Sequence, residues 1–482
     1  MMPQDLHGAA RDISVNSYDE QRSSNGVSMR ESGEIYSLHR DAIFLSDLLL
    51  IYFPALDGPL EYQYDEIMVI LLIIVYIAIL CLRYWLNWLN RTYLRVNGQI
   101  VPPEFKGIID PELLKKITNY TLENSRFGMI ESVISNILLV FFLFGGMLGY
   151  YDRWVNSLPG SFIGQGIIFA LLLFYIETVV DIPFSLYRNF RIENRYGFNT
   201  MTMRLWATDL VKSAAIATVL CCAVVFVALA IVQASPQWWW FWLWLFLLAF
   251  GIFMMYISPT VIEPLFFKFE SVKAEGLEVR IRSLMEKAGL KISRVFQVDA
   301  SRRSRHSNAY FTGIGSVKRI VLFDTLIEQM SQDEILAVLA HEVGHWKKRH
   351  VLKSIVLSET LAFCGLYLAF HLISWDALPG LINLSQASFY ARVIILGFIG
   401  SLVMFPMTPF FSYWSRRNER EADRFASELT QHPEYLASSL VKLSKENLSN
   451  LHPHPLYAKI YYSHPPIVER IRQLRKTGEG GI

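Results

Sequence analysis

Charged residues are scarce in this chain, at 18% of its 482 residues, where soluble proteins have about a quarter. That shortage argues against a soluble protein. Hydrophobic residues make up 52% of the sequence, and the mean hydropathy is +0.29. Aromatic residues, which favour the membrane–water boundary, are abundant, with 12 Trp, 23 Tyr and 32 Phe. The net charge of +2 argues neither for nor against nucleic acid, and we expect no nucleic-acid partner.

Cysteine is also scarce, and its placement excludes both a disulfide framework and a cysteine zinc site. The four cysteines lie inside apolar runs, and none is spaced as a zinc-binding pair, so we interpret them as reduced, small apolar side chains. Residues 1–40 lack an apolar stretch, which excludes a cleaved signal peptide and indicates a loose polar extension. The cysteines are Cys81, Cys221, Cys222 and Cys364.

Seven apolar runs are long enough to cross a bilayer, which takes about 20 residues. A shorter run at 43–56 is expected to lie at the membrane interface. We therefore predict a mainly α-helical, polytopic membrane protein with seven transmembrane helices and a small α/β domain. The expected spans are 67–89, 128–151, 161–185, 207–233, 238–257, 351–375 and 389–413.

Lysine and arginine are distributed unevenly over the connections between these spans. The 90–126 and 186–206 connections hold six and four of them, whereas 152–160 holds one and the connections 234–237 and 376–388 hold none. Because basic loops stay in the cytoplasm, the first two connections are predicted to be cytoplasmic. Residues 263–350, which we interpret as a soluble segment, and the C-terminal tail fall on the same side. The predicted domains are 1–62 (extension), 63–262 (first five spans), 263–350 (soluble mixed segment), 351–414 (last two spans) and 415–482 (C-terminal segment).

Some spans carry charged residues that lipid would not tolerate. Glu177 and Asp181 are four residues apart and so share one helical face. An ionised group facing lipid costs roughly 2.5–3.5 kcal/mol or more. These groups are either paired structural charges at helix ends or the lining of a wet interior cavity.

The sequence His341-Glu342-Val343-Gly344-His345 fits the zinc motif H-E-x-x-H. Two histidines four residues apart lie on one helical face and can share a tetrahedral zinc, with Glu342 placed to act on a zinc-bound water. Ser331 and Glu334 form a capping-box pattern, which predicts a helix beginning near 332. The alternative is an amphipathic helix that carries two histidines without a metal.

A catalytic zinc needs a third protein ligand and an open fourth position. The stretch 415–426 offers Glu419, Glu421 and Asp423, of which Glu419 and Asp423 share a helical face. One carboxylate would bind metal and the other would orient a histidine or carry a proton. The local charges leave the choice between Glu419 and Glu421 open, and the alternative for the whole stretch is a solvated helix at the membrane edge.

Six stretches together resemble the type I CAAX prenyl protease family, and the resemblance extends over about 60–482. Part of their amino-acid sequence is more similar to bacterial members of the family. The stretches are "PFSLYRNFRIENRYGFN" (183–199), "SRRSRHSNAYFTG" (301–313), "KRIVLFDTL" (318–326), "LAHEVGHWKKRH" (339–350), "SRRNEREADRFA" (415–426) and "YSHPPIVERI" (462–471).

The resemblance implies a role for each matching residue. His341, His345 and Glu419 would hold one zinc ion per chain, Glu342 would be the general base, and Asp423 would be a proton donor or support a ligand. The family fold also encloses a water-filled chamber within the membrane. Three further residues would contact the substrate: Asn308 on a strand that pairs with it, and His464 and Arg470 near the reacting oxygen.

The function implied is zinc-dependent proteolysis at the membrane, near protein C-termini and after a prenylated cysteine. The partners would be a peptide or protein substrate, lipid-modified in the CAAX case, and membrane lipid, and we expect a monomer. A bacterial inner membrane is favoured, or the endoplasmic reticulum if the chain is eukaryotic. The alternatives are quality control of unprenylated membrane proteins, a scaffold with a structural zinc, and a transporter, although no repeated halves are seen.

Overall fold

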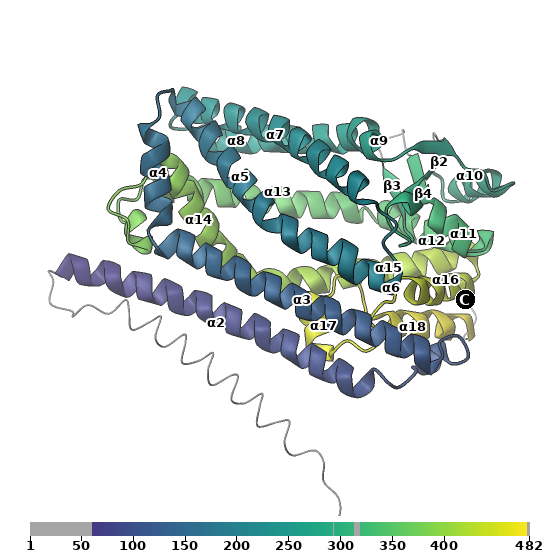
Figure 1. Cartoon of the computed structure of the whole chain (residues 1–482). Coiled ribbons are helices and arrows are strands. Elements are labelled where there is room, and N and C mark those ends of the chain that lie inside the picture. The colour runs from purple at the N-terminus through teal and green to yellow at the C-terminus, as the bar shows by residue number, and fades with distance from the viewer. Residues whose placement is uncertain (1–59, 293, 313–318, 480–482) are drawn as a thin grey trace, which may run out of the picture. The chain divides into compact units, whose positions relative to one another are not determined.

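The computed structural model describes residues 60–292, 294–312 and 319–479 (Figure 1). The chain falls into two units, of which Met1–Gln63 lies almost wholly outside the described residues. Residues 1–59 of the predicted N-terminal extension, which include the interfacial segment expected at 43–56, lie outside them too. The second unit is Tyr64–Ile482.

Seven helices of the described chain are long and apolar enough to cross a membrane, which confirms the predicted polytopic fold. They follow the expected spans in order, and most extend beyond them at one end or both, because helices continue past the hydrophobic run into polar residues. They are α2 (Leu60–Asn97), α3 (Pro111–Phe144), α5 (Phe162–Tyr187), α7 (Met203–Ala234), α8 (Trp239–Ile257), α13 (His350–Ile373), and α14 (Phe389–Met404) continued through η6 (Phe405–Met407) by α15 (Thr408–Thr430).

The second span differs from its prediction of 128–151. Helix α3 ends at Phe144, and Gly145–Gly146 turns the chain into a separate helix, α4 (Met147–Ser157). Gly146 has a left-handed backbone (φ 77°), which glycine adopts without strain. The apolar run continues through this break, so hydropathy alone does not reveal where the span ends.

Two spans end in π-helical turns where they approach the small sheet of the protein. Helix α5 continues into η2 (Arg188–Glu193) and then α6 (Asn194–Tyr196), and α8 continues into η3 (Ser258–Ile262) and α9 (Glu263–Phe266). Such turns shift the direction in which side chains leave the helix. After α6, Thr200 meets the loop before the third strand, where its hydroxyl donates to the Ser301 carbonyl.

A four-stranded sheet forms the α/β part, in the order β1-β2-β4-β3. The central strands β2 and β4 are parallel, and both outer strands run antiparallel to their neighbours. This sheet confirms that the predicted small domain is of the α/β kind. The elements are β1 (Phe269–Ser271), α10 (Leu277–Lys287), β2 (Arg294–Val298), η4 (Ala300–Arg302), β3 (Ala309–Thr312), β4 (Arg319–Phe323), α11 (Asp324–Gln329) and α12 (Gln332–Lys347).

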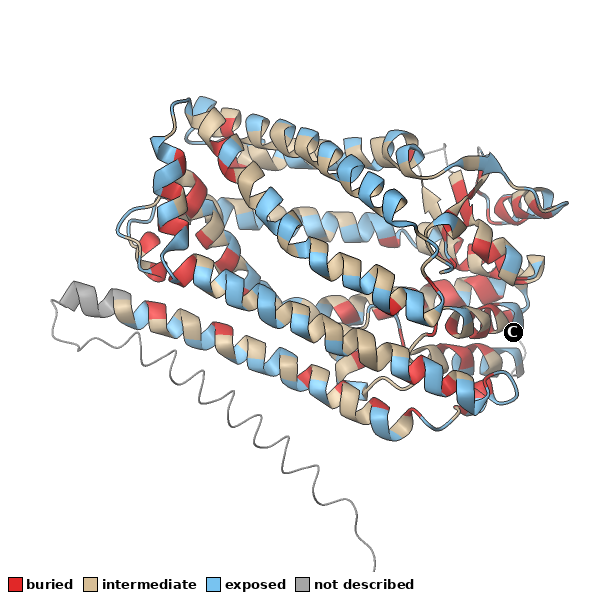
Figure 2. Cartoon of the chain, in the orientation of Figure 1, coloured by how far each residue is buried: buried red, intermediate tan, exposed pale blue. Residues whose placement is uncertain are grey.

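The C-terminal helices complete this part of the protein. Helices α15, α16 (Pro433–Glu446) and α18 (Ile467–Glu479) pack with α10 and α12 around one apolar core, and α17 (Pro455–Tyr461) packs on α15. Figure 2 shows that buried residues gather here, whereas the spans are mostly exposed or half-buried. We call the sheet, α10–α12 and α15–α18 the mixed domain.

Contacts place both basic connections on the side of the mixed domain, as predicted. Glu104 in the first connection, within η1 (Pro103–Phe105), accepts a hydrogen bond from Arg472 of α18 (2.7 Å). In the second connection, Asn199 forms a β-bridge with Ser304. The two connections and the C-terminal segment therefore lie at one end of the spans.

The charged residues of the spans divide into two groups. Asp209 of α7 pairs with Arg303 (2.8 Å), and Lys212 donates to the Leu265 carbonyl (2.8 Å), so these charges face protein. Glu177 and Asp181 are exposed on α5, and no described residue forms an ion pair with either. The paired-charge interpretation fits the first group, and the second group requires water.

Candidate metal centre

The H-E-x-x-H motif lies on helix α12. The first turn of this helix is held by its N-cap residue and by side chains of α16. Ser331 is the N-cap, and its hydroxyl accepts from the Glu334 N–H while the Ser331 N–H donates to the Glu334 carboxylate (2.8 Å). The predicted capping box is therefore confirmed. The same carboxylate accepts from Ser438 (2.6 Å) and Lys442 (2.7 Å) of α16. This network anchors the beginning of α12 to the C-terminal helices.

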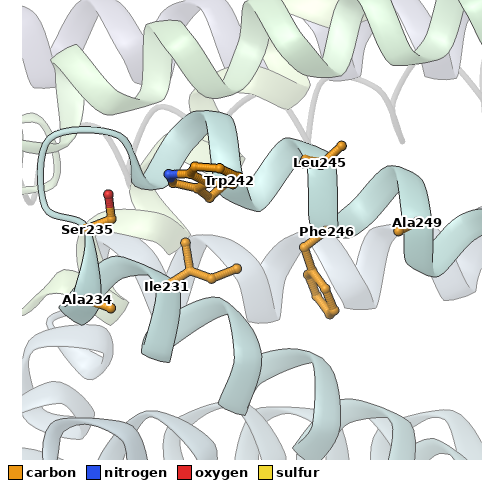
Figure 3. A pocket seen from close by; sticks show the side chains of 7 residues that line it. All are labelled: Ile231, Ala234, Ser235, Trp242, Leu245, Phe246 and Ala249. Carbon is orange, nitrogen blue, oxygen red and sulfur yellow. The ribbon is translucent and has the colours of Figure 1, made fainter.

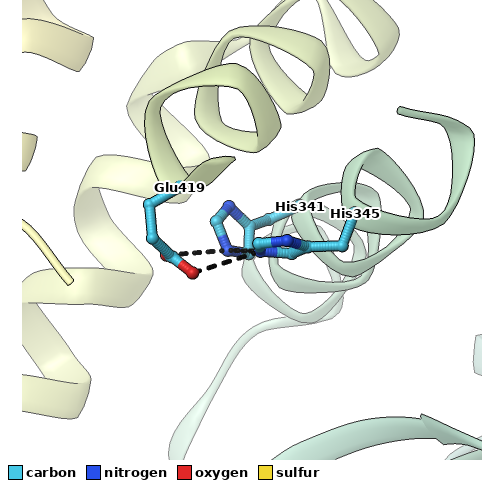
Figure 4. A group of neighbouring side chains, drawn as sticks. All are labelled: His341, His345 and Glu419. Carbon is cyan, nitrogen blue, oxygen red and sulfur yellow. Dashed lines mark hydrogen bonds and ion pairs between the residues drawn. The ribbon is translucent and has the colours of Figure 1, made fainter. Parts of the chain in front are cut away.

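Three donor atoms from α12 and α15 converge on one point (Figure 4). The Nε2 atoms of His341 and His345 are 3.2 Å apart. The carboxylate of Glu419 lies 3.4 Å from the first and 3.3 Å from the second. Ligand atoms at the corners of a tetrahedral zinc site, with bonds of about 2.0–2.2 Å, are separated by roughly 3.3–3.5 Å. The observed separations are close to these values, with Glu419 Oε2 facing His341 and Oε1 facing His345.

The surroundings of these atoms fit a divalent cation. The Glu419 Oε2 atom is buried and accepts no hydrogen bond from any described residue. A buried carboxylate oxygen without a hydrogen bond is costly unless a cation neutralises it. Among the described residues, the Arg470 guanidinium lies 3.5 Å from Glu419 and pairs with Asp423, and its charge also acts on Glu342. The donor set of two imidazoles and a carboxylate is that of a catalytic metal site, which keeps its fourth position open.

Close approach of α12 and α15 brings the ligands together. A Cβ atom on Gly344 would lie 2.9 Å from the Ala422 Cα and 3.1 Å from the Ala422 carbonyl oxygen. Backbone atoms cannot move aside as a side chain can, so this position requires glycine. Because Ala422 lies one turn after Glu419, the contact determines which face of α15 meets the two histidines.

Asp423 lies behind His341, away from the point where the ligands converge. Its Oδ1 is 2.8 Å from His341 Nδ1, and its two oxygens accept from Arg470 at 2.9 and 2.6 Å. Burial disfavours a charged imidazole, but the contacts with Asp423 and Glu419 prevail and raise the pKa of His341 to about 9. A cation on Nε2 would compete with that proton. Asp423 thus contacts a histidine and a guanidinium at once.

Two residues of the C-terminal segment also approach the Glu419 carboxylate. His464 Nε2 lies 3.3 Å and Arg470 Nη1 3.5 Å from its carboxylate. The loop that carries His464 is held by Arg416 of α15, whose guanidinium donates to the carbonyls of Ala458, Lys459 and Tyr462 (3.1, 2.9 and 2.6 Å). Sequence reasoning found His464 and Arg470 by resemblance and missed Arg416.

Glu342 differs from the other carboxylates of the centre. It is half-buried, and no described residue forms a hydrogen bond or an ion pair with it. Burial raises the pKa of its carboxyl, although His341 and His345 act in the opposite direction. A carboxylate with a raised pKa and no protein partner is suited to accept a proton from a bound water.

Asn308 lies directly before β3, the edge strand, which packs beside α12. Its side chain is exposed, and its Oδ1 accepts from the Ala309 N–H (2.9 Å). Its carbonyl accepts from the Phe323 N–H of β4 (3.1 Å). An edge strand can pair with an extended peptide, but the structure assigns Asn308 itself no contact with the ligands.

Glu421 and His350 form a contact that sequence reasoning missed. The Glu421 carboxylate lies 3.1 Å from His350 Nε2, and His350 Nδ1 lies 3.1 Å from His345 Nδ1. The sequence left open whether Glu419 or Glu421 is the third candidate ligand. The structure favours Glu419, because the face of α15 that carries it meets both Nε2 atoms, whereas Glu421 does not. No motif spacing marked His350 in advance, because it belongs to the next helix.

Two grooves of the described chain lie away from this centre. One of about 420 Å³ lies between α7 and α8 near their connecting turn, and its lining residues carry no charge (Figure 3). None of them belongs to the metal centre. The lining residues are Ile231, Ala234, Ser235, Trp242, Leu245, Phe246 and Ala249.

Comparison with known proteins gives matches in both halves of the chain. Residues 90–268 match the family described as "CAAX prenyl protease N-terminal, five membrane helices", and residues 271–478 match "Peptidase family M48". The CAAX prenyl protease 1 of Saccharomyces cerevisiae is 33% identical over 417 residues, which cover 81% of this chain and 91% of that protein. The chain belongs to the M48 peptidase family. The resemblance to type I CAAX prenyl proteases is therefore confirmed.

Other members give the same result. The CAAX prenyl protease 1 homolog of Arabidopsis thaliana is 34% identical, with 78% of this chain and 90% of that protein covered. The Homo sapiens homolog is 31% identical, with coverage of 78% and 88%. A crystal structure of S. mikatae Ste24p superposes with a TM-score of 0.78 at 29% identity and covers 84% of this chain and 99% of that chain.

Family membership identifies the protein as a membrane metallopeptidase, and the two histidines with Glu419 as its candidate metal site. The structural match supports the predicted architecture of a polytopic protein whose helices enclose a chamber. Water in such a chamber would surround Glu177 and Asp181.

Proposed function

We propose that the protein is a zinc endopeptidase of the CAAX type and that His341, His345 and Glu419 hold one zinc ion per chain. The observation that supports this most directly is the approach of the Glu419 carboxylate to both Nε2 atoms, at 3.4 Å through Oε2 and 3.3 Å through Oε1, with the two nitrogens 3.2 Å apart. A zinc ion bound there would supply a water of lowered pKa and polarise a substrate carbonyl. Nitrogen and carboxylate ligands in tetrahedral spacing favour zinc over magnesium or calcium, which prefer oxygen ligands.

Glu342 is proposed to be the general base. Its carboxylate lacks a protein partner, so it is free to accept a proton from the attacking water and to return it to the leaving amine. Asp423 is proposed to support the centre rather than to donate a proton, because its oxygens already contact His341 Nδ1 and Arg470. His464, with an exposed side chain beside Glu419, and Arg470 are proposed to stabilise the negative charge that develops on the substrate oxygen.

The substrate is proposed to be an extended C-terminal peptide whose prenylated cysteine precedes the bond that is cut. The named relatives are CAAX prenyl proteases, which supports this substrate class over unprenylated membrane proteins. The edge strand β3 beside α12 offers backbone groups to such a peptide, and Asn308 is proposed to help hold it. An apolar prenyl chain would remain at the level of the membrane spans.

The orientation is proposed to place the mixed domain and the C-terminus in the cytoplasm, because the basic connections share that end of the spans. We propose that the protein acts as a monomer, since both His341 and Glu419 come from one chain. Whether the membrane is a bacterial inner membrane, as favoured from the sequence, or the endoplasmic reticulum stays a prediction.

The test is the variant Glu342→Gln, assayed on a farnesylated C-terminal peptide and on its unmodified counterpart. We expect a fall in turnover of roughly 10²–10⁴-fold with zinc content unchanged. Glu328→Gln on α11, which replaces an exposed glutamate near α12, is the matched control and should keep full activity. Retained cleavage by Glu342→Gln would exclude this mechanism, and equal cleavage of both peptides by the unaltered protein would favour quality control.

A further inference from the structure

His350 lies behind the second histidine of the centre, where α12 passes into the membrane span α13. Its side chain is almost wholly buried, at 3% exposure. Arg349 adopts a left-handed backbone (φ 57°, ψ 32°), and this turn directs His350 back toward α12. There its Nδ1 lies 3.1 Å from His345 Nδ1, and its Nε2 lies 3.1 Å from the Glu421 carboxylate.

The carboxylate at the end of this chain of contacts fixes the direction of every hydrogen bond in it. Glu421 also accepts from Arg417 (3.3 Å) and, as an ionised carboxylate, can only accept. The proton of neutral His350 therefore lies on Nε2, and its Nδ1 lone pair accepts from the His345 Nδ1–H. The lone pair of His345 Nε2 is then left directed at the point where Glu419 and His341 converge.

His341 also has a carboxylate that acts on its Nδ1 atom, but here no second imidazole lies between them. There the Asp423 carboxylate lies 2.8 Å from Nδ1 as an ion pair, which favours a proton on Nδ1 and leaves Nε2 for a cation. The two imidazoles thus have matching tautomers, one set by an adjacent carboxylate and one by a carboxylate acting through an intervening imidazole. If His350 donated from Nδ1 instead, the His345 proton would move to Nε2 and block that donor atom.

We propose that His350 and Glu421 are positioning residues that hold His345 in the tautomer and orientation required to bind zinc through Nε2. This inference rests on the proposed zinc site. Glu421, which the sequence offered as an alternative metal ligand, would instead act on His345 through His350. The first residue of a membrane span is thereby tied to a metal ligand.

The experiment measures Zn²⁺ affinity of the full chain in detergent, by competition with a chromophoric chelator. We expect His350→Ala to weaken Zn²⁺ binding by roughly 10–100-fold, as outer partners of metal ligands commonly do, and Glu421→Ala to weaken it less. The double variant should bind no more weakly than His350→Ala alone, because Glu421 acts through His350. His350→Asn, whose side-chain oxygen can accept from His345 Nδ1–H, should restore part of the affinity.

Two substitutions on the same helices serve as matched controls. His371→Ala replaces an exposed histidine of α13, and Glu428→Ala replaces an exposed glutamate of α15, and both should leave Zn²⁺ affinity unchanged. In the Co²⁺-substituted protein, His350→Ala should change the visible absorption spectrum, which reports ligand geometry, whereas His371→Ala should not. Thermal unfolding in excess chelator establishes that each variant is folded.

A folded His350→Ala variant with affinity within about two-fold of the unaltered protein would overturn the proposal, as would effects that add in the double variant. If His350→Ala does not fold, Glu421→Ala decides, because Glu421 is partly exposed (32%) and unchanged affinity there would also overturn it. Absence of Zn²⁺ binding by the unaltered protein would instead refute the proposed function. The two failures are therefore distinguishable.

Discussion

Helices α12 and α13 follow one another in the chain, yet they differ in how much of each is buried within the protein. Half of α12 is buried, whereas α13 is buried only at its two ends, His350 and Ile373. No residue of the most apolar stretch of α13 is buried within the protein. The buried residues of α12 are Glu334, Ile335, Ala337, Leu339, Ala340, His341, Val343 and Gly344.

The difference follows from what surrounds each helix. Helix α12 contacts α10, α15, α16 and β3, so protein encloses it on several sides (Figure 1). Helix α13 contacts mainly α8 and α14, and the rest of its surface faces lipid or water. The candidate metal ligands are therefore held by protein packing, whereas the adjoining span is surrounded mainly by lipid or water. Matched substitutions in the two helices should reveal this contrast.

The largest effect on stability is expected from a matched pair of leucines. Leu339→Ala empties a fully buried position in α12 and should cost about 2–5 kcal/mol of unfolding free energy. Leu352→Ala, in α13 with 53% of its surface exposed, should cost less than about 0.5 kcal/mol. Unfolding in mixed micelles measures both values. Equal costs would show that α13 is packed as tightly as α12.

Loss of Arg416 should reduce activity without loss of metal. This residue lies where α15 passes from the membrane end into the mixed domain, and it holds the carbonyls that precede His464. Arg416→Gln should lower kcat/KM by about 10²-fold, because a small misplacement of a substrate-contacting group has that effect. Arg424→Gln, an exposed position on the same helix, is the control. Loss of zinc from Arg416→Gln would contradict the assignment.

Substitution of two glycines tests whether the close contact between α12 and α15 matters for stability and zinc binding. Gly344→Ala should force α12 and α15 apart, at a cost of about 1–3 kcal/mol, and weaken zinc binding, since Ala422 backbone atoms lie within 3.1 Å of the added carbon. Gly365→Ala in α13 meets no atom within 4 Å and should be neutral or stabilising. Unfolding and zinc titration check both. A neutral Gly344→Ala would show that the contact does not position Glu419.

Features that depend on neighbours in the sequence could be predicted from it. The zinc motif and the Ser331–Glu334 capping box need only the spacing of a helix, and the spans need only hydropathy. The break at Gly145–Gly146 was missed because apolar residues continue on both sides of it. Asp423 as the partner of His341 was one of two alternatives, and its i+4 spacing from Glu419 already indicated a shared face.

Features that depend on how two helices meet could not be predicted. The choice of Glu419 over Glu421 depends on the rotation of α15 about its axis, which the contact of Gly344 with Ala422 determines. His350 depends on the left-handed turn at Arg349, because an unbroken helix would direct its side chain elsewhere. Residues of this kind are recognised only in three dimensions, unless a family resemblance supplies them.

The smallest effect is expected at the beginning of α12 and depends on pH. Burial raises the pKa of Glu334, but hydrogen bonds from Lys442, Ser438 and Ser331 outweigh it and hold that pKa below its ordinary value. A carboxyl with a lowered folded-state pKa stabilises the protein above its unfolded pKa, near 4.3, and loses that stabilisation as pH falls through the folded value. Glu334→Gln should therefore cost about 1 kcal/mol at neutral pH and progressively less in acid.

The matched control is Glu278→Gln, which breaks a half-exposed pair with Arg282 one turn along α10. Such pairs contribute about 0.3–0.5 kcal/mol and are screened by salt, so this variant should differ little from the unaltered protein at any pH. Unfolding free energies measured from neutral pH to below the pKa of free glutamate compare the two. If both variants showed the same pH dependence, the buried network at Ser331 would hold α12 no more firmly than a surface ion pair. The contrast between the enclosed helix and its exposed neighbours would then have to rest on apolar packing alone.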